Sequence, residues 1–289
     1  MAENSTKNIL RRQKLAPHKK LGQNFLVHRH TAERIVQLAD IEKNDIVTEV
    51  GVGLGALTEP LAKAARKIIG IEADSGIIRM HREQKDLPEN VDLRHQDILQ
   101  TDFEQLAEES GGRIIFVANL PYSISTPFLF RLFANAHLVR KGIIMLQKEV
   151  ALRLMAGPGT KEYGVPTVLL ASCADIKMLM QVKPEEFHPR PKVDSAVVRL
   201  RFSPVPEKVE RLDKFCANTL RKVVNAAFGQ RRKTLLNALA GGNFHQTKKQ
   251  LSTILLSCDI SPSIRAERLE IQDFIRLANA LEEHIHTID

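Results

Sequence analysis

Four consecutive residues, Asn119, Leu120, Pro121 and Tyr122, combine groups that could hold a planar amine. The side-chain oxygen of Asn119 and the carbonyl of Leu120 or Pro121 can accept two N–H bonds, and Tyr122 can stack on an attached ring. Adenine carries such an amine, whose lone pair is delocalised into the ring until two acceptors draw it out of conjugation. A proline turn with a buried tyrosine is the alternative, and four residues alone leave both open.

A glycine-rich segment forms a second candidate site. Gly51, Gly53 and Gly55 follow a predicted strand at residues 45–50 and precede a predicted helix, where glycine lets the backbone approach a nucleotide-like ligand. Glu72 ends the next predicted strand, 19 positions beyond Gly53, where a carboxylate can accept both ribose hydroxyls. Tight packing alone would also explain the glycines, and helix capping would explain Glu72, although Asp74 is already the better cap.

Two further residues could complete a site for a nucleoside. Asp97 follows a predicted strand at residues 91–95 and could accept the amino group of an adenine ring, although aspartate is common in surface loops. Phe187 precedes two prolines that stiffen the chain, so it could stack on the base opposite Tyr122. A phenylalanine that fastens a loop to the core is an equal alternative.

The elements that must position these residues alternate along the chain. Apolar runs predict strands at residues 45–50, 67–71, 91–95, 113–118, 142–146, 176–182 and 193–202, and helical patterns follow the first, second, fourth and fifth of them. Strands alternating with helices predict a doubly wound, mostly parallel sheet, at whose edge ligands bind. From residue 204 onward only helical patterns occur, which predicts a basic arm at 1–20, an α/β domain at 21–203 and a small helical domain at 204–289.

The charge favours a polyanionic partner. The chain of 289 residues has a formal net charge of +8, and one basic run contains no acid between residues 221 and 233. A solvated helix face is the usual meaning of such a run. Beside the basic N-terminus, a surface that contacts phosphates is the better interpretation, and charge alone does not choose between nucleic acid and an anionic membrane surface. The residues of this run are Arg221, Lys222, Arg231, Arg232 and Lys233.

Other classes are disfavoured. No apolar run reaches the roughly 18 residues of a membrane span, so we expect a cytoplasmic protein without membrane association. The three cysteines, Cys173, Cys216 and Cys258, are far apart and not in Cys-x-x-Cys spacing, so neither a disulfide framework nor a metal site is predicted.

Taken together, these motifs resemble the ribosomal RNA adenine dimethyltransferase family. The resemblance rests on residues 21–26, 49–55, 119–125, 187–195 and 228–233, and it extends from about Leu21 to the C-terminal helices. It implies a Rossmann-like class I methyltransferase with a seven-stranded sheet and S-adenosylmethionine as cofactor. The implied cofactor contacts are Asn24, Leu26, Gly51, Glu72, Asp97 and Asn119.

The resemblance also implies the substrate. Members of the family that act on the small subunit methylate two adjacent adenosines near the 3′ end of 16S rRNA, within the subunit precursor, and we expect a monomeric enzyme of this kind. The related 23S rRNA dimethyltransferases of macrolide resistance share the cofactor and base motifs, but residues 157–164 and 228–233 look more like the 16S enzymes. A non-catalytic RNA-binding assembly factor is the alternative from another class, and the intact Glu72, Asp97 and Asn119 disfavour it.

Overall fold

The protein is described by a computed structural model of residues 23–286, with side chains to residue 283. The expected basic arm at 1–20 lies outside the described residues. The chain forms two compact units, which we call the sheet unit and the helical unit. The sheet unit contains the described residues up to Ala151 together with Ile176–Pro204, and the helical unit contains Leu152–Asp175 and the chain from Val205 onward.

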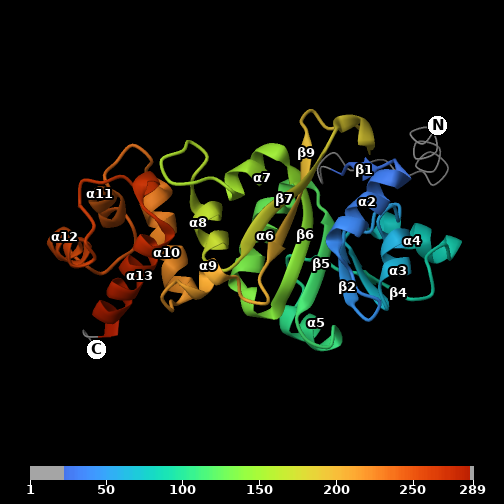
Figure 1. The fold of residues 1–289 in the computed structure, drawn as a ribbon, viewed down its shortest axis with the longest axis horizontal. Coiled ribbons are helices and arrows are strands. Elements are labelled where there is room, and N and C mark those ends of the chain that lie inside the picture. Colours follow the sequence, from blue (N-terminus) through green and yellow to red (C-terminus); the bar gives the residue numbers. More distant parts are fainter. Residues whose placement is uncertain (1–22, 287–289) are drawn as a thin grey trace. The chain divides into compact units, whose positions relative to one another are not determined.

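The sheet unit is built on one seven-stranded sheet in the order β4-β3-β2-β5-β6-β9-β7 (Figure 1). The pairs β2–β3, β3–β4, β2–β5 and β5–β6 are parallel, and β6–β9 is antiparallel. The predicted mostly parallel sheet is therefore confirmed. Its strands are β2 (Ile46–Val50), β3 (Lys67–Glu72), β4 (Val91–His95), β5 (Ile114–Asn119), β6 (Val139–Gln147), β7 (Asp175–Val182) and β9 (Ser195–Arg201).

The strand order reverses between β4 and β5, which places the crossover helices on both faces because such connections are right-handed. Strand β5 shows the two cores, since its side chains alternate between faces. Ile115 and Val117 belong to the core that contains residues of α2 (Arg29–Ala39) and α3 (Thr58–Ala64). The Phe116 ring instead lies 5.2 Å from that of Phe103 in α5 (Phe103–Glu109) and 5.4 Å from that of Phe128 in α6 (Tyr122–Ala134), centroid to centroid.

The reversal brings the ends of two neighbouring strands together at one edge of the sheet. The carboxyl ends of β2 and β5 lie side by side there, because Val50 pairs with Ala118 directly before the glycine segment and Asn119. This is the topological position at which open α/β sheets bind ligands. Helix α6 begins at Tyr122, so it starts within the Asn119 to Tyr122 segment itself.

The helical unit takes in a segment that the sequence placed in the first domain. Residues 152–175 include α8 (Val165–Ala171), which packs against α10 (Ala217–Gly229). The Tyr163 hydroxyl donates a hydrogen bond of 2.9 Å to the Leu269 carbonyl, and its ring lies 5.9 Å from that of Phe228. These contacts group the segment with the C-terminal helices, whereas the expected division near residue 204 coincides with the second boundary between the units.

One expected helix is interrupted. The pattern at residues 209–228 predicts a continuous helix, but α9 (Glu207–Glu210) ends before α10 begins. Side chains of α13 (Ile271–His286) bond the chain between them: Gln272 donates to the Asp213 carboxylate, and Asn279 donates to the Lys214 carbonyl at 2.8 Å. The remaining helices are α4 (Ser75–Gln84), α7 (Lys148–Leu154), α11 (Leu235–Ala240) and α12 (Lys248–Ser257).

Across residues 23–286, none of the helices has both the length and the apolar character that crossing a membrane requires.

Candidate active site

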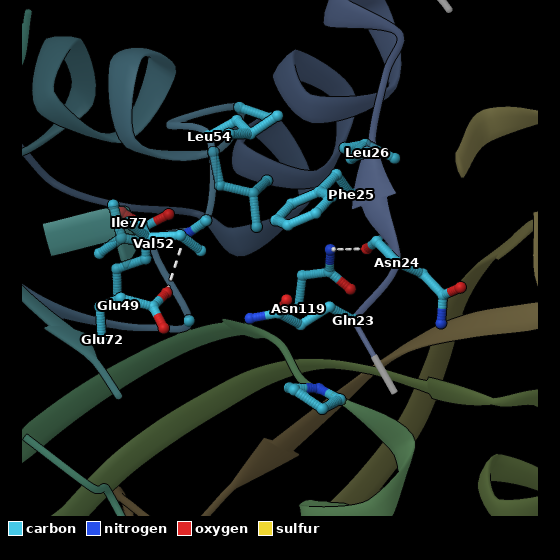
Figure 2. A pocket seen from close by; sticks show the side chains of 15 residues that line it. Gln23, Asn24, Phe25, Leu26, Glu49, Val52, Leu54, Glu72, Ile77 and Asn119 are labelled. Atoms are coloured by element: carbon cyan, nitrogen blue, oxygen red, sulfur yellow. Dashed lines mark hydrogen bonds between the residues drawn. The ribbon is translucent and has the colours of Figure 1, made fainter. Parts of the chain in front are cut away.

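A pocket opens where β2, β3 and β5 end, and five of the six expected cofactor residues line it (Figure 2). They come from four parts of the chain: the segment before α2, the turn after β2, the end of β3 and the end of β5. The joint placement of Gly51, Glu72 and Asn119 was expected from the sequence, since parallel strands end at one edge of a sheet, whereas Asn24 and Leu26 were expected from the family resemblance. These five are Asn24, Leu26, Gly51, Glu72 and Asn119.

The glycine turn forms one wall, and its backbone requires glycine. Gly51 and Gly53 have φ angles of +78° and +54°, in the left-handed region that side chains disfavour. A Cβ on Gly51 would lie 3.3 Å from the Asn119 carbonyl oxygen, and one on Gly53 would lie 3.2 Å from the Phe25 ring. The turn therefore brings bare backbone to the pocket, as a bound nucleoside requires.

Glu72 is held in place by backbone donors. The amide of Gly53 donates to its Oε2 at 3.0 Å, and the amide of Asp74 donates to its Oε1 at 2.8 Å. Burial raises the pKa of Glu72, and these two donors oppose the rise. Each carboxylate oxygen has a second acceptor position, so Glu72 can still accept two hydroxyl groups.

Asn119 faces the N-terminal segment. Its Nδ2 donates to the Asn24 carbonyl at 3.2 Å, the contact drawn as a dashed line in Figure 2. This bond fixes the orientation of the side-chain amide. The Asn119 side-chain oxygen is then the atom that can accept a hydrogen bond from a substrate amine.

Tyr122 and Ser195 join α6 to β9. The Tyr122 hydroxyl and the Ser195 hydroxyl are 2.7 Å apart, and Ser195 is fully buried. Burial raises the pKa of Tyr122, so its phenol stays neutral at physiological pH. The hydrogen bond fixes the direction of the aromatic ring next to the Asn119 segment.

The structure distinguishes the two loop carbonyls. The Pro121 carbonyl accepts from the Ile124 amide at 3.1 Å and from the Ser125 hydroxyl at 3.4 Å. These bonds begin α6 and occupy that oxygen. The Leu120 carbonyl is therefore the better second acceptor for an amine, while the Leu120 side chain is buried in the core.

Phe187 does not form an open stacking surface in this structure. A two-stranded antiparallel ribbon pairs β1 (Phe25–Leu26) with β8 (Phe187–His188), and Leu26 lies opposite Phe187. The Phe187 side chain is 1% exposed and belongs to the core that also contains Leu26. The structure thus shows the alternative role, in which the ring fastens its loop to the core, and a stacking role would require the ring to leave this position.

Asp97 does not line the pocket. It follows β4, and the neighbouring Gln96 amide donates to the Glu72 carbonyl at 3.0 Å, so its loop is adjacent to the site. The exposed Asp97 carboxylate accepts from the Leu99 amide at 2.9 Å and from the Gln100 side chain at 3.3 Å. These local bonds shape the loop, and recognition of an adenine amine by Asp97 stays a prediction.

The basic cluster lies in the helical unit, and all five of its side chains are exposed. Arg231 differs from the others because its Nη2 donates to the Lys161 carbonyl at 2.8 Å and its Nε lies 3.7 Å from the Glu267 carboxylate. Arg231 therefore attaches the loop at 157–164, and its charge is partly compensated. Arg221, Lys222, Arg232 and Lys233 are the better candidates for phosphate contacts, a role that stays a prediction.

Glu49 is a pocket residue that the sequence analysis did not single out. It is fully buried, and within the described residues neither of its carboxyl oxygens has a hydrogen-bond partner. Burial, and then the nearby Glu72 charge, raise its pKa to about 8, while the Thr58 hydroxyl opposes the shift without a full hydrogen bond. Its position two residues before Gly51, at the end of a strand, was the available signal.

These residues fit a cationic nucleoside ligand. Glu72 offers acceptors for ribose hydroxyls, the glycine turn offers bare backbone, and Glu49 is a buried acid without a partner beside the pocket. A sheet with this strand order, ending in an antiparallel strand, and a site of this composition define a class I methyltransferase that uses S-adenosylmethionine.

The chain belongs to the ribosomal RNA adenine dimethylase family, whose sequence profile it matches over residues 15–283. It is 48% identical over 289 residues to a ribosomal RNA small subunit methyltransferase A from Desulfotalea psychrophila, which covers 97% of each chain. It is 39% identical over 288 residues to the protein of the same name from Bacillus thuringiensis, again with 97% of each chain covered.

Solved structures agree with this assignment. A dimethyladenosine transferase from Plasmodium falciparum superimposes with a TM-score of 0.72 and 25% identity, covering 90% of this chain and 98% of that one. The 23S rRNA methyltransferase ErmE superimposes with a TM-score of 0.62 and 23% identity, covering 90% of this chain and all of the other, a similarity of fold alone. The chain is thus an rRNA adenine dimethyltransferase, and the expected family is confirmed.

Proposed function

We propose that this enzyme dimethylates two adjacent adenosines near the 3′ end of 16S rRNA in the precursor of the small ribosomal subunit. The observation that carries the choice of substrate is the 48% identity, over nearly the whole of both chains, to a relative named for the small subunit. We also propose that it acts in the cytoplasm as a monomer.

The 23S rRNA enzymes are the rival with the same chemistry. Their similarity to this chain is one of fold, since ErmE is only 23% identical, whereas several relatives named for the small subunit are 37–48% identical. This difference favours the small subunit as the substrate.

The proposed reaction depends on how the chain holds the target amine. Asn119 Oδ1 and the Leu120 carbonyl accept hydrogen bonds from the two N–H groups of the amine, which makes the nitrogen lone pair available. The Tyr122 ring, directed by Ser195, stacks on the extruded base. Asn24, Leu26, Gly51, Glu72 and Asn119 would hold the cofactor, with Asp97 at the adjacent loop.

S-adenosylmethionine supplies an activated methyl group on a sulfonium centre. The methylated amine is acidic enough to lose its proton to water, so no general base is assigned among the pocket residues. Alignment of the two reactants in one pocket is therefore the main source of the rate.

The test is to incubate the protein with radiolabelled cofactor and either small-subunit particles from an unmethylated strain or large-subunit precursors, and to map the label. The expected result is dimethyladenosine at two neighbouring positions near the 3′ end of 16S rRNA. Label in 23S rRNA would instead assign the enzyme to the rival substrate.

A further inference from the structure

His81 lies behind the glycine turn, with both ring nitrogens in hydrogen bonds. It occupies the last turn of α4, and its side chain is 1% exposed. Nδ1 is 2.7 Å from Oδ1 of Asp86, and Nε2 is 2.8 Å from the carbonyl oxygen of Gly53. The ring thus connects the end of α4 to the turn that lines the pocket.

Both partners of the ring are acceptors. A backbone carbonyl cannot donate a hydrogen bond, and neither can an ionised carboxylate, which Asp86 presents with its side chain 40% exposed. Neutral imidazole carries a single N–H and could satisfy only one of them. The doubly protonated imidazolium satisfies both, and the C-terminal turn of a helix also favours a cation.

We propose that His81 is a positioning residue of the cofactor site: as an imidazolium anchored by Asp86, it fixes the Gly53 peptide from behind. The inference rests on the role of the glycine turn in holding the cofactor. It assigns a function to two side chains that do not themselves line the pocket.

The Gly53 peptide transmits the effect to the pocket. His81 donates to the carbonyl of Gly53, and the amide of Gly53 donates to Glu72, which would hold the ribose. Without the ring, the Gly53 carbonyl loses this donor, and the direction of the Gly53 amide toward Glu72 is no longer fixed from behind.

Other charged groups around His81 enter the same balance. Asp86 contacts the ring directly, and Lys85 caps the same helix. Glu59 of α3 lines the same surface hollow as His81 and Asp86, and it favours the cation. Beyond the Gly53 peptide lie Glu72 and Glu49, both in the pocket.

The predicted consequence is a weaker cofactor site when the hydrogen bond from His81 to Gly53 is removed. We expect His81→Leu to bind S-adenosylmethionine about tenfold more weakly than the wild type, which corresponds to about 1.4 kcal/mol. Calorimetric titration with S-adenosylmethionine measures this difference.

The variants isolate the contribution of His81. Asp86→Asn removes the charge that anchors the ring and should weaken cofactor binding in the same direction as His81→Leu. The exposed His137→Gln is the matched control and should keep the wild-type affinity. Equal affinities for His81→Leu and the wild type would overturn the proposal.

A second readout does not depend on cofactor binding and uses a variant only to assign the resonances. The two ring ¹⁵N resonances of His81, assigned by their disappearance in His81→Gln, should both have protonated shifts near pH 7 in the full-length protein. A neutral tautomer at that pH would overturn the proposal. Failure of the wild type to bind cofactor at any pH would instead contradict the proposed cofactor site, and the ¹⁵N result would stand independently.

Discussion

At the scale of single residues, the site depends on side chains whose partners come from distant parts of the sequence. Asn119 is oriented by the carbonyl of Asn24, and Tyr122 by the hydroxyl of Ser195. Glu49 is the exception, since it is buried without a hydrogen-bond partner among the described residues. The oriented residues should control turnover, whereas Glu49 should also affect stability.

Asn119→Ala should reduce methylation at least about 100-fold, because the target amine loses an acceptor and its alignment. Cofactor affinity should fall much less, since the other four expected cofactor residues in the pocket lining remain. Single-turnover methylation and calorimetry measure the two effects, with the exposed Asn44→Ala as control. Turnover close to that of the wild type would remove Asn119 from the mechanism.

Glu49→Gln should stabilise the protein at alkaline pH. The folded state keeps the Glu49 proton up to about pH 8, whereas the unfolded chain releases it near the ordinary value of 4.5. The unfolded state therefore binds fewer protons between these values, so the free energy of unfolding decreases as pH rises through this window, by up to about 1.4 kcal/mol per pH unit.

Urea denaturation of wild type and Glu49→Gln at about pH 5, 7 and 9 measures this effect. The difference in the free energy of unfolding between the two proteins should be smallest at about pH 5. It should grow toward about pH 9, where the wild type contains the buried Glu49 charge and the variant does not. A difference independent of pH would contradict the assigned protonation of Glu49.

At the scale of elements, α6 connects the two ends of the proposed site. It begins at Tyr122, and its Arg131 donates to the carbonyls of Leu99 and, at 2.5 Å, of Thr101. The guanidinium also lies 4.5 Å from the centre of the Phe103 ring. One helix therefore begins in the segment proposed to hold the amine and fixes the loop that carries Asp97.

If Asp97 recognises the cofactor, Arg131→Met and Asp97→Asn should each weaken cofactor binding by about tenfold, and the double variant should be little worse than either, because both act through one loop. Calorimetry on the four proteins forms the cycle. Fully additive losses would show that Arg131 does not act through the Asp97 loop.

The elements also show what the sequence could predict. The sheet and the convergence of Gly51, Glu72 and Asn119 were predictable, because strand periodicity and the parallel topology place them at one edge. The burial of Phe187 was not, because it depends on pairing with Leu26, more than 150 residues away. The interruption before α10 likewise depends on side chains of α13, which local patterns do not contain.

At the scale of the whole molecule, the net charge of +8 favours binding to a ribosomal precursor. The other four residues of the basic cluster should make the largest electrostatic contribution to binding, since Arg231 is already paired with Glu267. Each phosphate contact adds roughly 0.9 to the slope of log affinity against log salt, for a duplex.

Replacement of Lys222, Arg232 and Lys233 by Gln should therefore weaken binding to small-subunit particles and reduce the salt slope by up to about 3. Filter binding across a salt series measures both quantities. The control removes an equal charge from exposed positions of the sheet unit: Arg34, Lys43 and Lys63. Equal slopes for the two triple variants would place the cluster outside the RNA contact.

The path of the chain has a consequence for synthesis. Residues 152–175 leave the ribosome before β9, yet Tyr163 and α8 find their contacts on α10 and on the segment around Leu269, which are translated much later. The apolar side chains of residues 152–175 therefore stay exposed until the C-terminal helices have been synthesised. A protein truncated after Pro204 would lack these helices, so the apolar side chains would stay exposed. We expect such a protein to aggregate instead of forming an isolated methyltransferase fold.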